Sequence, residues 1–168
     1  PISLDMPLHI YIYSNVDDLK ATLPFGGVDW VGGHAQPDLG IVLASIAPGD
    51  SQKIEMETLI PHEVAHVMMY RALGENYFKQ PLWLLEGFAA SMELYPNLGY
   101  GEALNNAVAN ETLIPFVDLC ASFPADTGSA FLAYAQSESF LNYIRGAYGN
   151  GSVAKLTDAY SEGLSCNT

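Results

Sequence analysis

The first fifty residues contain short apolar runs separated by turn-forming residues, which is the pattern of β-strands. Leu8 to Tyr13 is rich in β-branched and aromatic side chains, and Gly40 to Ser45 is a second apolar run. We expect a strand in each of these segments and another short strand near Asp29 to Val31. Asp17 to Leu23 predicts a short helix with Asn15 as its candidate cap.

After about Gln52 the apolar residues recur at helical spacing, and glycine and proline separate the helical segments. The expected breaks are Gly74, Pro96-Asn97, Pro115, Pro124 and Gly149-Asn150. A strand-rich part at 1–52 followed by a helical part at 53–168 predicts the α+β class, with a small, mostly antiparallel sheet. A chain of 168 residues is large enough to bury one core, so we expect a single domain over 1–168.

Pro61 decides where the longest expected helix begins. Proline suits the first turn of a helix but breaks the interior, because it lacks an N–H and its ring clashes with the preceding turn. We therefore expect this helix to begin between Glu57 and Leu59, with Thr58 as a candidate cap, and to span about 57–73. Gly74 is a natural end for it.

This helix carries the sequence His62-Glu63-Val64-Ala65-His66. Residues four apart lie on the same face of a helix, so His62 and His66 can direct two imidazoles at one metal ion. Zinc accepts such nitrogens at roughly 2.0–2.1 Å. Glu63 lies beside the first histidine, where its carboxylate can take a proton from an attacking water. The motif alone leaves open a surface helix that happens to carry two histidines.

A third ligand is expected further along the chain, because a catalytic zinc usually has three protein ligands. The best candidate is Glu86, within a stretch from Pro81 to Glu93 whose apolar residues recur near helical spacing. A carboxylate among apolar neighbours is costly unless it is paired or bound to a metal. The alternative is an exposed glutamate on the polar side of an amphipathic helix.

The two blocks HEVAH and WLLEGFAASME together resemble the zinc-binding segments of gluzincin metallopeptidases, and more closely the small peptidase MA-like domains. The resemblance covers most of the chain and implies a helical zincin-type subdomain. It implies that His62, His66 and Glu86 bind Zn²⁺ and that Glu63 is the general base and acid. It also implies that Tyr134 donates a hydrogen bond to the oxyanion, although most tyrosines simply pack or face water.

Two departures from the aminopeptidase branch of this family change the expected activity. Leu85 stands where that branch has an asparagine, and the chain has no GxMEN-type segment, which in that branch recognises the free amino terminus of the substrate. We therefore expect a zinc-dependent metallopeptidase that is an endopeptidase rather than an aminopeptidase. A catalytically silent gluzincin-like domain that serves as a binding or scaffolding module is the alternative.

The strand before the zinc-binding helix is our candidate for binding the substrate. Its residues Ile41, Val42, Leu43 and Ala44 are expected at an edge of the sheet, where an extended peptide could pair with them. A central strand that is paired on both sides is the alternative, because the apolar run is unbroken.

Composition limits the partners. A net charge of −13 with only six lysines and arginines argues against binding to nucleic acids or to anionic membranes. The hydrophobic content of 49% excludes a largely disordered chain. No apolar run approaches the ~20 residues that a membrane-spanning helix needs. The expected partner is therefore a peptide or protein substrate, and the oligomeric state stays open.

Two cysteines bear on the cellular location. Cys120 and Cys166 could form a disulfide in an oxidising compartment, or both could be ordinary thiols. Together with the low lysine count and the family resemblance, they favour an extracytoplasmic or secreted protein. The sequence begins at Pro1 without a leader, so we expect a catalytic domain excised from a longer chain whose signal peptide is absent or removed.

Overall fold

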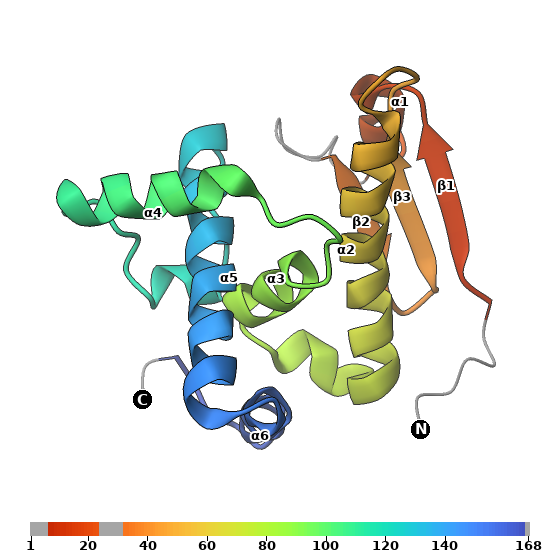
Figure 1. The fold of residues 1–168 in the computed structure, drawn as a ribbon. Coiled ribbons are helices and arrows are strands. Elements are labelled where there is room, and N and C mark those ends of the chain that lie inside the picture. The colour runs from red at the N-terminus through yellow and green to blue at the C-terminus, as the bar shows by residue number, and fades with distance from the viewer. Residues whose placement is uncertain (1–6, 24–31, 167–168) are drawn as a thin grey trace. The chain divides into compact units, whose positions relative to one another are not determined.

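A computed structural model describes residues 7–23 and 32–166 (Figure 1). The elements in chain order are β1 (His9–Tyr13), α1 (Val16–Lys20), β2 (Gly33–Gln36), β3 (Ile41–Ser45), α2 (Gln52–Leu73), the 3-10 helix η2 (Gly74–Lys79), α3 (Leu82–Ala90), α4 (Leu98–Ala109), the 3-10 helix η3 (Asp118–Cys120), α5 (Thr127–Tyr148) and α6 (Gly151–Ser161). The chain divides into two compact units. The first unit is Pro1–Gly74 with Met92–Tyr95, and the second is Glu75–Ser91 with Pro96–Thr168.

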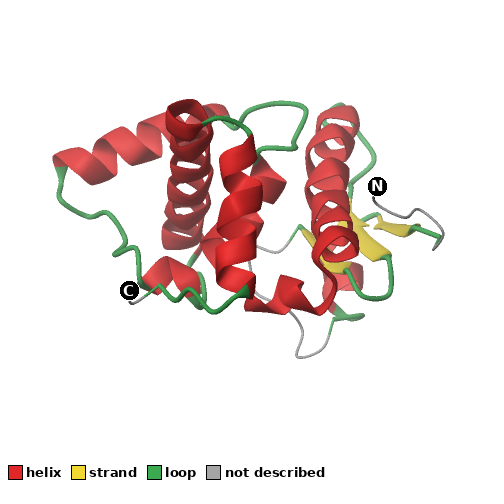
Figure 2. Cartoon of the chain, turned by 90° about the horizontal axis from the view of Figure 1, so that it is seen from below, coloured by secondary structure: helices red, strands yellow, loops and turns green. Residues whose placement is uncertain are grey.

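The strands of the described residues form one small sheet in the first unit, and the second unit is helical (Figure 2). This arrangement confirms the predicted α+β class. The sheet has the order β1-β3-β2 and is mixed, with β1 parallel to β3 and β2 antiparallel to β3. We expected mostly antiparallel pairing. A parallel pair needs a crossover connection, and α1 and β2 lie between β1 and β3 in the chain.

The central position of β3 corrects one expectation. Ile41 lies opposite His9 on one side and opposite Gln36 on the other, so β3 is paired along both edges. The expected edge position of Ile41–Ala44 is therefore wrong, and an extended peptide cannot pair there. The unbroken apolar run has a physical reason, because Val42 and Ala44 are completely buried in the sheet. The strand expected near Asp29 to Val31 lies outside the described residues.

Helix α2 packs against β2 and β3 (Figure 1) and begins earlier than the proline suggested. It starts at Gln52, so the expected start between Glu57 and Leu59 is wrong and Pro61 lies inside the helix. The reason is that the carbonyl oxygen of Glu57, which the missing N–H of Pro61 leaves free, accepts a hydrogen bond from Leu94 N–H at 3.1 Å. The helix ends as expected before Gly74, whose φ is 57°.

The helices of the second unit follow the predicted breaks. Asn97 caps α4 and Asp126 caps α5, each through a side-chain oxygen that accepts a backbone N–H. Helix α3 differs, because the helical stretch predicted to reach Glu93 ends at Ala90. Its buried residues Trp83 and Leu84 belong to a core that includes Leu119, Ala133, Leu141, Val153 and Tyr160.

A disulfide joins Cys120 in η3 to Cys166 near the end of the described chain. Of the two possibilities that the sequence left open, a disulfide or two ordinary thiols, the structure therefore shows the disulfide. None of the helices in the described ranges combines the length and the apolarity that a membrane span requires.

Helices α3 and α5 approach each other closely at Gly87. A Cβ atom on Gly87 would lie 2.6 Å from the backbone oxygen of Ser137, which a rigid helix cannot move away cheaply. We predict that Gly87→Ala forces the helices apart and lowers the free energy of unfolding by about 1–3 kcal/mol. Chemical denaturation measures this loss.

The matched control is Gly101→Ala in α4, where no described atom lies within 4 Å of the added Cβ. There the substitution should leave stability unchanged or raise it by about 0.5–1 kcal/mol, because alanine is the better helix former. Equal stabilities of the two variants would contradict the close packing of α3 on α5.

Candidate metal centre

Helix α2 buries three ionisable side chains in two successive turns. His62, Glu63 and His66 are only 8%, 7% and 7% exposed. The rings of His62 and His66 meet edge to face with their centroids 5.3 Å apart, as the spacing of four residues on one helix face requires. Burial of such groups costs free energy unless each has a polar partner, so we expect polar contacts on this face of α2.

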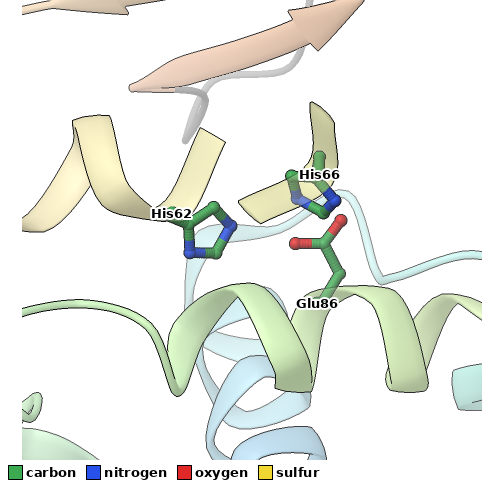
Figure 3. Close-up of side chains that lie close together, drawn as sticks. All are labelled: His62, His66 and Glu86. Carbon is green, nitrogen blue, oxygen red and sulfur yellow. The ribbon is translucent and has the colours of Figure 1, made fainter. Parts of the chain in front are cut away.

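Glu86 in α3 completes a group that could hold a metal ion. His62, His66 and Glu86 each offer one ligand atom, and these atoms all lie within 4.8 Å of one another (Figure 3). A tetrahedral ion with bonds of about 2.1 Å separates its ligand atoms by roughly 3.4 Å. Two imidazole nitrogens and one carboxylate oxygen are donor atoms that such an ion accepts. The residues present therefore fit a transition-metal ion.

A further carboxylate contacts the first histidine. Nδ1 of His62 lies 2.9 Å from Oε1 of Glu93, and the two side chains are 11% and 9% exposed. An ionised carboxylate can only accept, so Nδ1–H of His62 donates this bond, and in the neutral imidazole Nε2 is then the nitrogen that carries the lone pair. The contact therefore sets the tautomer that a metal ion requires.

Strand β2 lies directly against Glu63. A Cβ atom on Gly33 would lie 2.5 Å from Oε1 of Glu63 and 2.9 Å from its Cγ. Only glycine leaves room for the Glu63 carboxylate at this point of the strand. Because Gly33 pairs with Ala44 of β3, the sheet holds the strand that encloses the Glu63 carboxylate.

The sequence also suggested a substrate-binding strand and a tyrosine at this site. Ile41–Ala44 is the central strand β3 and has no free edge. Tyr134 lies on α5, where its ring packs edge to face on Phe123 with centroids 5.0 Å apart. A role for Tyr134 in catalysis stays a prediction.

The sequence did not predict that Gly33 and Glu93 lie at this centre. Gly33 carried a signal, since a glycine inside a strand indicates close approach of another group. Glu93 ends the WLLEGFAASME block, but nothing local in the sequence indicated its contact with His62, which spans 31 positions of the chain.

The comparison with known families agrees with this geometry. The family model of the Peptidase MA superfamily matches residues 1–168 of the chain. No curated protein and no solved structure matches it. Metal dependence is typical of this superfamily, and the cluster of His62, His66 and Glu86 could bind such an ion.

We predict that the purified chain binds one divalent transition-metal ion and that Glu86→Ala lowers the bound amount, because one of three ligands is lost. Elemental analysis after dialysis against the metal measures the stoichiometry. The matched control is Glu102→Ala, which removes an exposed carboxylate from α4 and should leave the metal content unchanged. Equal metal content in the two variants would exclude Glu86 as a ligand.

Proposed function

Since the chain belongs to the Peptidase MA superfamily, we propose that it is a zinc-dependent metallopeptidase, and an endopeptidase rather than an aminopeptidase. The observation that carries this proposal is the grouping of His62, His66 and Glu86 with the buried carboxylate of Glu63 on the same helix as the two histidines. Two histidines and one glutamate are a ligand set of hydrolytic zinc enzymes, and they leave one coordination position for water or substrate.

A bound zinc ion would supply Lewis acidity, which polarises the scissile carbonyl and acidifies the attacking water. The chain itself supplies the proton transfer. Glu63 takes the proton of the attacking water and delivers it to the nitrogen of the leaving amine. Its burial, at 7% exposed, keeps bulk water away from this carboxylate. Tyr134 is our candidate donor to the oxygen that becomes negatively charged, since a phenol can stabilise such charge.

The substrate-binding strand that the geometry favours is β2. It lies at the end of the order β1-β3-β2, and no other described strand pairs with its outer edge. An extended peptide could add to this edge through main-chain hydrogen bonds. Because Gly33 touches Glu63, a peptide bound along β2 passes close to the proposed general base. Such pairing engages the main chain and needs no free terminus, which favours an endopeptidase.

The disulfide supports a proposal on location. Cys120 and Cys166 are bonded to each other. Disulfides form and persist in oxidising compartments and are rare in the reducing cytosol. We therefore propose that the protein works outside the cytoplasm or is secreted.

Glu63→Gln tests the reaction. The variant should retain zinc, because Glu63 is not one of the proposed ligands, but it should lose hydrolysis by about 10²–10⁴-fold, which is the usual contribution of a general base. Mass spectrometry of a mixed peptide library, with and without a chelator, measures cleavage. Full activity of the variant would exclude the mechanism. Zinc binding without cleavage by the unmodified protein would favour a silent binding module.

Gly33→Ala tests the enclosure of Glu63. The added Cβ must displace the Glu63 side chain, which can rotate, so we expect folding and zinc content to be retained and kcat to fall by about 10²-fold, the cost of a misplacement of about 1 Å. Steady-state kinetics on a cleaved peptide measure kcat. Gly32→Ala is the matched control, because its Cβ would make ordinary contact with Leu59 at 3.4 Å. Equal kcat values of the two variants would contradict the role of Gly33.

A further inference from the structure

The geometry points to Met92–Tyr95 as a segment that positions the proposed metal ligand His62. The segment is bound to α2 through the backbone oxygen of Glu57, which lacks its helical partner because residue 61 is a proline. We refer to these residues as the 92–95 segment. They belong to the same compact unit as α2. The inference rests on the proposed metal site and adds a device that holds one of its ligands.

The 92–95 segment makes two hydrogen bonds to one residue of α2, Glu57. The N–H of Leu94 donates to the backbone oxygen of Glu57 at 3.1 Å. The hydroxyl of Tyr95 donates to Oε2 of the same glutamate at 3.0 Å. Glu57 therefore binds both the backbone and a side chain of the segment.

Pro61 makes the first of these bonds available. In an uninterrupted helix the N–H of residue 61 would donate to the oxygen of residue 57. Proline has no N–H, so a proline inside a helix costs stability and leaves one carbonyl without its helical partner. Here that carbonyl is the one that binds Leu94. The proline thus converts an internal helix bond into a docking point for another segment of the chain.

Burial of apolar side chains does not explain why the segment lies there. Leu94 is 62% exposed, Tyr95 47% and Met92 39%. The side chain of Glu93, in contrast, is 9% exposed and faces His62. The polar residue points inward and the apolar residues point outward, which is the reverse of ordinary loop packing. Polar contacts hold the segment, and the group it brings to α2 is the Glu93 carboxylate.

The contact with Glu93 fixes the imidazole ring of His62. The bond from Nδ1–H of His62 to Glu93 holds both the plane of the imidazole and the tautomer that leaves Nε2 as a ligand. Glu93 is a positioning residue, since it acts through His62. Pro61 and Glu57 act one step further away, by fixing the segment that carries Glu93.

The experiment measures zinc affinity, by competition with a chromophoric chelator, and the melting temperature of the metal-free protein. Glu93→Ala should weaken zinc binding by about 10–100-fold, as is usual for the loss of a partner of a ligating histidine. Glu93→Gln should weaken it less, because the amide oxygen can still accept Nδ1–H.

Pro61→Ala separates positioning from general stability. The alanine restores an N–H that competes with Leu94 for the oxygen of Glu57, so zinc affinity should fall by on the order of tenfold. The melting temperature should stay equal or rise, because the helix loses its proline. Opposite effects on affinity and stability are the signature of the positioning role. A fall of both in Pro61→Ala would assign the proline a general structural role and overturn the inference.

Glu55→Ala is the matched control on the same helix. Glu55 accepts the N–H of Ala47 at 3.2 Å and the hydroxyl of Ser51 at 2.6 Å, so its loss should lower the melting temperature and leave zinc affinity unchanged. Unchanged affinity in both Glu93→Ala and Pro61→Ala would overturn the inference while the proposed metal site stands. A wild-type protein that binds no zinc would overturn both. Failure to cleave peptides affects only the proposed reaction.

Discussion

The burial of three ionisable side chains on one face of α2 is the constraint on which the rest of this centre depends. Histidine and glutamate lose hydration when they are buried, and the loss must be offset by partners at defined distances. His62 has such a partner in Glu93, 31 positions further along the chain, with its Oε1 at 2.9 Å from Nδ1. Gly33 of β2 leaves the space that the Glu63 side chain occupies. Two distant segments of the chain therefore meet at this face of α2.

Two glycines show how closely this face and its surroundings are fitted. Gly33 admits the Glu63 carboxylate to the sheet, and Gly87 admits the backbone of Ser137 to α3. Gly87 directly follows Glu86, so the close packing of α3 on α5 fixes the helix that presents this ligand candidate. In both places a glycine lies beside a carboxylate of the candidate site and leaves space that any side chain would fill. A pattern of apolar and polar residues does not predict such a requirement.

The parts of the centre that depend on local spacing could be predicted from the sequence. The positions of His62 and His66 on one helix face follow from the helical period, and the end of α2 follows from Gly74. The start of α2 could not be predicted, because the partner that makes Pro61 tolerable is Leu94, far along the chain. The central position of β3 also depends on pairing with distant strands, and an apolar run alone is compatible with either position.

On the proposed function, metal binding would also balance the charge of this face. Glu63 is buried on the same helix as the two histidines, Glu93 contacts His62, and Glu86 adds a third carboxylate to the candidate metal group. In a chain with a net charge of −13, few cations are available to balance them, and a divalent ion is the largest local charge that such a site can receive. Because the proposed ligands converge only in the folded chain, binding of an ion there would stabilise the same contacts that create its site. On the proposed function, folding of this face and metal loading would be one coupled equilibrium, in which the proposed role of the 92–95 segment is to lower the cost of ordering His62 before the ion arrives.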